Sequence, residues 1–343
     1  MLRFCIVGAG FIGGVHAQAL AAIPEAAVTV VCSRNEEKAR AVAEPVGAVW
    51  VNDYRQAVAR PDVDVVCICT PSGAHAEIAE AAAAAGKHLV VEKPIEITLE
   101  RVDRIIAAAQ KAGVKLTCIF PLRFMQGPAL TKQAIEAGRL GRLALADAYI
   151  KWYRSQSYYD TSDWKGTWAL DGGGALMNQG IHHIDLLNYL AGPVNRIVAR
   201  TATLAHQMET EDTAVALLAF ANGSLGTIEG STASWPGDSG RIELHGDKGT
   251  IALEDGRIVT WQLQDAAPDE EERMLALESQ QGSGAAAATG ISYELHRRQL
   301  ADMIEAILKN RPPAVTGAEA RHSVAIIRAI YESHEQRRWI EPA

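Results

Sequence analysis

Two short segments of the sequence carry side chains that could support a proton transfer during a redox reaction. Asn178 and His182 are four residues apart, so a helix over 176–190 would carry both on one face. Lys93 stands in Glu92-Lys93-Pro94, directly after an apolar run that predicts a strand. A neutral imidazole can take the proton of a hydroxyl, and an ammonium can stabilise the charge that develops on the oxygen. We therefore predict His182 as the acid–base group and Lys93 as its electrostatic partner. The alternative for His182 is a core or capping histidine.

A glycine-rich segment near the N-terminus could hold the redox cofactor. It reads Gly8-Ala-Gly10-Phe11-Ile12-Gly13, and it follows an apolar run over 2–7 and opens a helical pattern. In such a setting Gly8 permits a tight turn, Gly10 lets the backbone approach a pyrophosphate, and Gly13 allows close packing of helix on strand. The helix N-terminus then offers N–H groups to the phosphates. The segment predicts a dinucleotide site, with a turn that binds no ligand as the alternative.

The residues after the second predicted strand bear on the choice of dinucleotide. An NAD site usually places Asp or Glu there, about 20 residues beyond the glycines, to bind the ribose hydroxyls. This chain has Ser33-Arg34, with Lys38 close behind. A guanidinium can pair with a 2′-phosphate, so we favour NADP(H), with NAD(H) as the alternative if Arg34 is solvated or stacks on the adenine.

The elements that must position these groups fall into two patterns. Up to residue 120, short β-runs alternate with helices, which predicts a doubly wound α/β domain with a parallel sheet. The expected strands are 2–7, 28–33, 63–69, 88–92 and 115–119, and the expected helices are 13–22, 36–42, 76–85 and 99–112.

From residue 121 the pattern changes to helices followed by consecutive strands, which predicts an α+β domain over 121–343 with a large, mostly antiparallel open sheet. The expected helices are 128–138, 176–190, 294–309 and 318–334, the last two closing the domain, and the expected strands are 143–153, 196–203, 213–220, 224–231, 241–245, 250–253 and 258–262. Residues 266–290 are expected to form a mobile loop or linker. An apolar sheet face without a helix layer predicts a homodimer or homotetramer.

Composition narrows the class of protein further. The 343 residues carry a net charge of −8, with a pI of about 5.7, so no basic surface for nucleic acid is expected. No apolar run is long enough to span a membrane and the N-terminus does not read as a signal peptide, so we expect a cytoplasmic protein. The five cysteines have no zinc spacing and are expected to be small buried groups; we predict no metal.

An aromatic and polar loop precedes the segment with Asn178 and His182. It contains Trp152-Tyr153-Arg154 and, further on, Tyr158-Tyr159 and Trp164. Aromatic faces with interspersed hydrogen-bonding groups suit a sugar ring, so Tyr153 and Arg154 are candidates for substrate contacts. Simple domain packing is the alternative.

The motifs taken together resemble the Gfo/Idh/MocA family of glucose–fructose oxidoreductases and inositol dehydrogenases. The resemblance is carried by the glycine loop of residues 8–13, by Thr70-Pro71-Ser72 with His75, by Ala85-Gly86-Lys87-His88, by Glu92-Lys93-Pro94, by Gly172-Gly-Gly174 and by Gly180-Ile-His182. It implies a two-domain oxidoreductase that binds NAD(P) in the first domain and a sugar or polyol against the second sheet.

The resemblance also implies roles for individual residues. Thr70, Pro71, Ser72 and His75 would line the cofactor cleft, and Glu92 and Lys93 would lie near the nicotinamide ribose and the substrate. Arg123 would border the nicotinamide, and Trp164 and Lys165 would belong to a segment of the second domain that reaches back over the cofactor.

One position departs from the family pattern, because Asn178 stands where well-studied members have Asp. An amide cannot act as a base or raise the pKa of a histidine by its charge, so Asn178 is expected to hydrogen-bond the substrate. Two alternatives to a sugar or polyol dehydrogenase stay open. They are a dehydrogenase acting at carbon 3 of a nucleotide-linked sugar and a regulator that senses the dinucleotide without catalysis.

Overall fold

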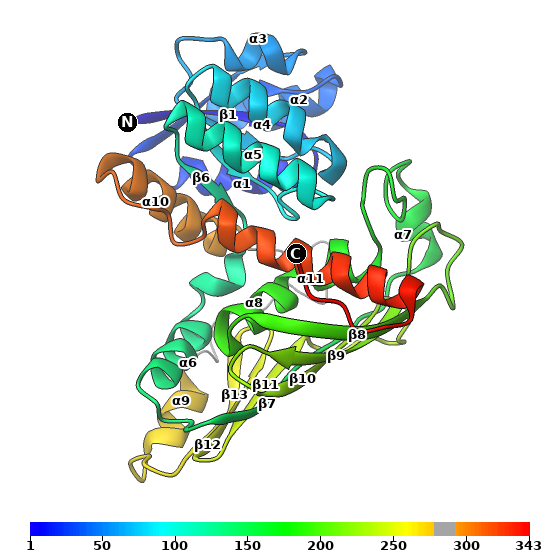
Figure 1. Cartoon of the computed structure of the whole chain (residues 1–343). Helices are drawn as coiled ribbons and strands as arrows, with labels where there is room; N and C mark the ends of the chain where they lie inside the picture. Colours follow the sequence, from blue (N-terminus) through cyan, green and yellow to red (C-terminus); the bar gives the residue numbers. More distant parts are fainter. Residues whose placement is uncertain (278–291) are drawn as a thin grey trace. The chain divides into compact units, whose positions relative to one another are not determined.

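The computed structural model describes residues 1–277 and 292–343, which form two compact units. The first comprises Met1–Pro121 and Ser292–Arg321, and the second comprises Leu122–Ile291 and His322–Ala343 within the described residues. Both are drawn in Figure 1. The expected linker over 266–290 lies partly outside the described residues; inside them, Glu270–Ala276 forms helix α9.

The first unit is built on a six-stranded parallel sheet in the order β3-β2-β1-β4-β5-β6, as predicted for a doubly wound domain. Its strands are β1 Leu2–Val7, β2 Ala26–Cys32, β3 Val49–Val51, β4 Val65–Ile68, β5 His88–Val91 and β6 Leu116–Cys118. Its helices are α1 Phe11–Ala21, α2 Glu36–Ala43, α3 Tyr54–Val58, α4 His75–Ala84, α5 Leu99–Ala112 and α10 Glu294–Leu308, with short 3₁₀ turns at Glu44–Val46 and Ser72–Ala74. Sequence analysis did not anticipate β3 or α3.

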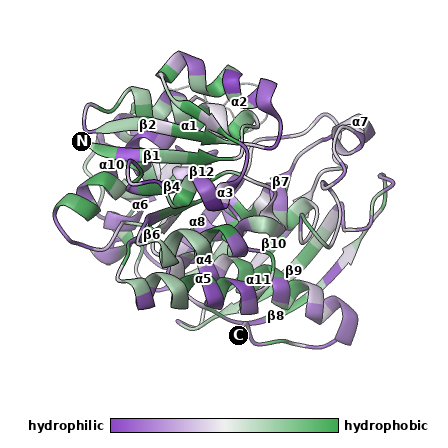
Figure 2. Ribbon diagram, turned by 90° about the horizontal axis from the view of Figure 1, so that it is seen from above, coloured by the Kyte–Doolittle hydropathy of each residue, from purple (hydrophilic) through white to green (hydrophobic). Residues whose placement is uncertain are grey.

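Most strands of this sheet are largely buried on both sides, which explains their continuous apolar sequences, whereas the edge strand β3 has no buried residue. Every residue of β4 is buried, and Figure 2 shows β1 and β4 as mainly hydrophobic. None of the five cysteines forms a disulfide and all are buried, as predicted, because four of them lie in strands of the sheet and Cys69 directly follows β4.

Helix α10 belongs to the first unit, although sequence analysis assigned the closing helices over 294–334 to the second domain. Its apolar face packs on α1 and joins the core of the parallel sheet through Leu300, Met303 and Ile304. Gln299 adds polar contacts, because its amide donates to the Cys118 carbonyl and accepts from the Phe120 N–H. Helix α11 (Gly317–Gln336) starts in the first unit and ends in the second.

The second unit is built on a seven-stranded sheet in the order β13-β12-β11-β7-β10-β9-β8, in which only the β7–β10 pair is parallel. This confirms the predicted mostly antiparallel sheet. Its strands are β7 Leu143–Lys151, β8 Val194–Ala202, β9 Thr213–Phe220, β10 Leu225–Ser231, β11 Arg241–Gly246, β12 Gly249–Glu254 and β13 Arg257–Leu263. Its helices include α6 Gln126–Glu136, α7 Gln156–Asp160, a π-helix over Ala175–Gly180, α8 Ile181–Ala191 and α9, and a 3₁₀ turn spans Pro121–Phe124.

Alternation of exposed and buried residues along β9 shows that one face of this sheet is covered and the other is open. Helix α8 packs on the covered face, against β7 and β11. Within the described part of the chain, no helix is both long enough and apolar enough to cross a bilayer.

Candidate active site

The glycine loop has the geometry that a dinucleotide site needs. Gly8 adopts a φ of 110°, which favours glycine, and a Cβ there would collide with the carbonyl of Cys69. A Cβ at Gly13 would collide with the carbonyl of Gly8, whereas one at Gly10 would meet no atom within 4 Å. Gly8 and Gly13 are therefore required by the fold itself. The open space at Gly10 is consistent with the approach of a ligand.

Helix α1 begins at Phe11, directly after Gly10, and no side chain caps its N-terminus. Its first N–H groups can thus donate hydrogen bonds to an anion, which the positive end of the helix dipole also favours. Phe11 is exposed and Ile12 is half-buried at the same turn.

The end of β2 carries no acidic side chain at the position where a ribose would bind. The hydroxyl of Ser33 accepts from the Asn35 N–H at 3.2 Å, and the Ser33 carbonyl accepts from the indole of Trp50. Arg34 is exposed, and its side chain makes no hydrogen bond or ion pair with any residue of the described chain.

Thr70, Pro71 and Ser72 lie between β4 and α4, and His75 is the first residue of α4. The ring of the buried His75 lies 3.0 Å from the carbonyl oxygens of both Pro94 and Thr70. It thereby ties the loop after β4 to the loop after β5, where Lys93 stands. A neutral imidazole can donate to only one of these carbonyls at a time.

A buried cluster of three side chains surrounds the residue before Lys93. Nε2 of His16 donates to Oε1 of Glu92 at 2.7 Å, and Nε2 of His296 lies 3.7 Å from the same oxygen. Oε2 of Glu92 accepts the backbone N–H of Lys93 at 3.2 Å. Glu92 therefore fixes the backbone from which the Lys93 ammonium extends.

The electrostatics of this cluster favour one ionised carboxylate. Burial would raise the pKa of Glu92, but His16 and His296 hold it well below its ordinary value through hydrogen bonds and charge. Burial lowers the pKa of His16 against the opposing effect of Glu92.

The spacing of the same three side chains does not suit a metal ion. Their possible ligand atoms lie within 4.8 Å of one another, but the 2.7 Å separation between His16 and Glu92 is that of a hydrogen bond. It is shorter than the roughly 3.3 Å between neighbouring ligands of a tetrahedral zinc site.

Sequence reasoning missed His16 and His296. The one available signal was that His16 falls three residues after Gly13, at the start of a helix next to the predicted cofactor loop. His296 lies on α10, far away in the sequence, and nothing in its local pattern connects it with Glu92.

In the second unit, Arg123 forms a buried ion pair with Asp185. Its guanidinium donates two hydrogen bonds of 2.7 Å to Asp185 on α8 and stacks 4.6 Å from the centre of the Tyr189 ring. The hydroxyl of Ser323 also donates a hydrogen bond to Asp185. These contacts anchor α8, which carries His182. The role of Arg123 at the nicotinamide stays a prediction.

The residues predicted to form one α-helix over 176–190 instead form the π-helix Ala175–Gly180 followed by α8. Asn178 lies in the first and His182 in the second, so the simple i, i+4 argument does not describe their placement. The start of the π-helix is held by the buried Glu211, whose carboxylate accepts the N–H groups of Gly174 and Leu176 and the hydroxyl of Tyr331. Burial, opposed by these donors, raises the pKa of Glu211 to about 7.

Asn178 is paired with a carboxylate that sequence reasoning overlooked. Its Nδ2 donates to the buried Asp171 at 2.6 Å, and the other oxygen of Asp171 accepts the Gly166 N–H. One N–H of the Asn178 amide is therefore used within the protein, and its hydrogen bond to the substrate stays a prediction. Oδ1 of Asn178 lies 3.4 Å from the amide of Gln179.

The predicted aromatic loop is brought to the same segment by Arg154 rather than by Tyr153. Arg154 donates to the side chain of Gln179 at 3.0 Å, whereas Tyr153 packs edge-on against Trp235 with ring centres 5.0 Å apart. The carbonyl of Trp164 accepts from Thr167, which closes a turn between the loop and Gly172.

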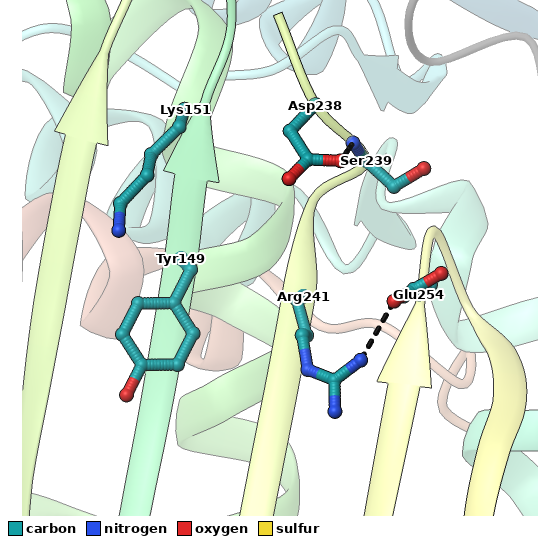
Figure 3. Close-up of a pocket in the computed structure, with 6 residues that line it drawn as sticks. All are labelled: Tyr149, Lys151, Asp238, Ser239, Arg241 and Glu254. Atoms are coloured by element: carbon teal, nitrogen blue, oxygen red, sulfur yellow. Dashed lines mark hydrogen bonds and ion pairs between the residues drawn. The ribbon is translucent and has the colours of Figure 1, made fainter.

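A separate depression of about 230 Å³ lies on the seven-stranded sheet and contains none of the predicted site residues. Figure 3 shows that its charged groups come from β7, β11, β12 and the segment before β11, and that Arg241 pairs with Glu254. Lys151 pairs with Glu229. Both cations of this depression, Lys151 and Arg241, are thus already paired with carboxylates.

The parallel sheet with a glycine-rich turn, and the second unit with a histidine on a helix covering an open sheet, define a dinucleotide-binding oxidoreductase. Within that class, the chain belongs to the Gfo/Idh/MocA family. The model of an oxidoreductase family with an NAD-binding Rossmann fold matches residues 2–120, and that of the GFO/IDH/MocA C-terminal domain matches residues 129–252.

Named relatives extend this similarity over the whole chain. Myo-inositol 2-dehydrogenase of Thermotoga maritima is 28% identical over 350 residues, covering 99% of this chain and 98% of that one. The WlbA dehydrogenase of Bordetella pertussis, solved with NADH and UDP-GlcNAcA, is 33% identical with a TM-score of 0.90, covering 99% and 97%. Levoglucosan dehydrogenase, solved with NADH and levoglucosan, is 26% identical with a TM-score of 0.84, covering 99% of each chain. This chain is thus an NAD-binding oxidoreductase of the sugar and polyol dehydrogenase type, acting on CH–OH groups.

Proposed function

We propose that this protein transfers hydride between a nicotinamide dinucleotide and a secondary alcohol or ketone of a sugar, a sugar derivative or an inositol-like polyol. The observation that carries the proposal is the glycine loop, which leaves open space at Gly10 beside an uncapped helix N-terminus. The full-length similarity to dehydrogenases solved with NADH supports it.

Each group has a role that follows from its chemistry. The nicotinamide, when bound, gives or takes the hydride. His182 accepts the hydroxyl proton during oxidation and returns it during reduction. The Lys93 ammonium, fixed through the Glu92 carboxylate, stabilises the negative charge on the substrate oxygen. The N–H groups at the start of α1 hold the pyrophosphate.

We further infer that the preferred cofactor is NADP(H). Arg34 is exposed and makes no ion pair with the described residues, and no carboxylate follows β2 at the position that would bind a ribose hydroxyl. Titration with NADPH and NADH decides between them, and tighter binding of NADH would refute this assignment.

A homodimer or homotetramer formed through the open sheet face is part of the proposal. Leu145, Val215, Leu217 and Leu225 on β7, β9 and β10 are each about half exposed, at 46–56%. A row of apolar side chains on one sheet favours burial against another copy. A monomeric mass in solution at micromolar concentration would contradict this assembly.

The catalytic proposal is tested with a Lys93→Ala variant and a panel of sugars and inositols. We expect a loss of about 10²-fold or more in kcat, with the Kd of the dinucleotide changed less than threefold, because the ammonium acts on the developing charge. An equal loss of turnover and cofactor affinity would contradict the assigned role. Dinucleotide binding without any turnover would favour a sensor.

The second candidate function is the oxidation of a nucleotide-linked sugar. It is favoured by the similarity to the WlbA dehydrogenase, which was solved with UDP-GlcNAcA. Turnover of UDP-sugars, but not of free sugars or inositols, would identify it.

A further inference from the structure

Two cations in the second unit flank one aromatic ring and form no ion pair within the described part of the chain. The guanidinium of Arg154 lies 5.6 Å from the centre of the Tyr158 ring, and Nζ of Lys165 lies 3.9 Å from it. Both side chains are half-buried. Among the described residues, neither makes an ion pair, whereas Arg123, Arg139 and most other arginines do.

The hydrogen-bonding capacity of both cations is only partly used. Arg154 donates to the Tyr153 carbonyl and to Gln179, but its Nε is buried and has no partner in the described chain. Lys165 donates to the Tyr158 carbonyl at 3.3 Å. Buried donors without partners are unfavourable, so the site is better suited to a state in which an anion is bound.

One buried carboxylate offsets part of the charge of the pair. Asp171 acts on Lys165 through its charge, and its two oxygens accept hydrogen bonds from Asn178 and Gly166. Arg154 and Lys165 with Asp171 therefore leave one net positive charge in a chain whose total is −8. Burial lowers the pKa of Lys165; the charge of Asp171 opposes this effect, and Arg154 adds a smaller contribution in the same direction as burial.

The location of the cations ties them to the substrate side of the proposed reaction. Arg154 bonds to Gln179, which follows Asn178 and precedes His182 by three residues. We propose that Arg154, Lys165 and the ring of Tyr158 form an oxyanion subsite that binds a negatively charged group on the sugar. That group is a carboxylate on the ring or a phosphate attached to it. This inference rests on the proposed function and names its substrate class.

The chemistry fits such a group. A guanidinium offers parallel N–H donors to a carboxylate or phosphate, and an ammonium beside it adds a second charge. The face of Tyr158 provides an apolar surface for a sugar ring.

The experiment compares charged and neutral sugars in the full-length protein. Glucuronate, glucose 6-phosphate and UDP-glucuronate are each paired with glucose or UDP-glucose. We expect kcat/KM to be at least tenfold higher for one charged sugar than for its neutral counterpart. Preference for glucuronate would identify a ring carboxylate, and preference for glucose 6-phosphate alone would identify a phosphate.

Arg154→Gln and Lys165→Gln should each reduce that preference tenfold or more by raising KM, with the Kd of NAD(P)H unchanged. Arg154→Lys, which keeps the charge but loses the planar donors, should retain part of it. Arg200→Gln, an exposed position on β8, is the matched control and should leave the preference intact.

The outcomes separate this inference from the proposed function. If neutral and charged sugars turn over equally, the dehydrogenase stands and the subsite is refuted. If the variants instead weaken NAD(P)H binding, the cations serve the cofactor and the inference is refuted. If no sugar reacts, the binding of the same charged sugars to the NADH complex is measured by calorimetry. The subsite is refuted if the wild-type protein and Arg154→Gln bind these sugars equally well.

Discussion

The buried Glu211 makes the stability of the second unit dependent on pH. Its carboxyl accepts two backbone N–H groups at the start of the π-helix and the hydroxyl of Tyr331. Burial nevertheless raises its pKa from an ordinary value of 4.5 to about 7. The folded protein therefore binds a proton between these pH values that the unfolded chain has already released.

The sign and size of the effect follow from proton linkage. Stability falls as the pH rises wherever the folded state holds more protons than the unfolded state. The stabilisation from the raised pKa of Glu211 is thus complete below pH 4.5 and is lost by about pH 7. At about 1.4 kcal/mol for each tenfold change in acidity, the loss amounts to roughly 3 kcal/mol.

Glu211→Gln imitates the protonated carboxyl and removes the titration. Urea denaturation at pH 5, 6, 7 and 8 should show similar stability for variant and wild type at pH 5. By pH 8 the variant should be more stable by up to roughly 3 kcal/mol. Glu209→Gln, an exposed neighbour, controls for the loss of a charge. A constant difference between Glu211→Gln and wild type across this range would refute the reasoning.

Two further predictions concern packing and acid stability. Gly13→Ala places a Cβ against the Gly8 carbonyl, so we expect a loss of about 1–3 kcal/mol in stability and at least tenfold weaker dinucleotide binding, measured by denaturation and calorimetry. Gly14→Ala, whose Cβ would meet no atom within 4 Å, should be neutral or stabilising, and equal effects at both positions would argue against the packing explanation. Arg139, with help from the Trp261 indole, holds the pKa of Glu270 at about 2, which contributes stability above pH 4.5 that is lost as the pH falls toward 2. Arg139→Met should cost about 1–2 kcal/mol at pH 7 in urea denaturation, and the deficit should shrink below pH 4.5; an unchanged deficit would contradict the ion-pair origin.

Local sequence patterns predicted much of the architecture because their causes are local. Continuous apolar runs indicated strands buried on both faces, and β1, β2, β4, β5 and β6 follow them. The order of glycines in the loop over 8–13 predicted a turn whose tight contacts at Gly8 and Gly13 involve nearby backbone. The consecutive strands after residue 190 predicted the antiparallel part of the second sheet.

Other features depended on residues far apart in the chain. His16, Glu92 and His296 meet in one buried cluster, although up to 280 residues separate them in the sequence. Helix α10 joins the first unit because its apolar side chains complete the core beside α1. Its amphipathic pattern predicted a helix but could not identify its partner.

The sequence by itself therefore determined the class of fold, the cofactor loop and the identity of the candidate proton-transfer groups, since propensity, periodicity and glycine geometry act over a few residues. The tertiary structure decided what surrounds those groups. Asp171 accepts a hydrogen bond from the amide of Asn178, Glu211 holds the start of the π-helix, and Nε of Arg154 is buried without a hydrogen-bond partner among the described residues. Burial and unbalanced charge arise only when distant segments pack together, and they set the energies of these groups.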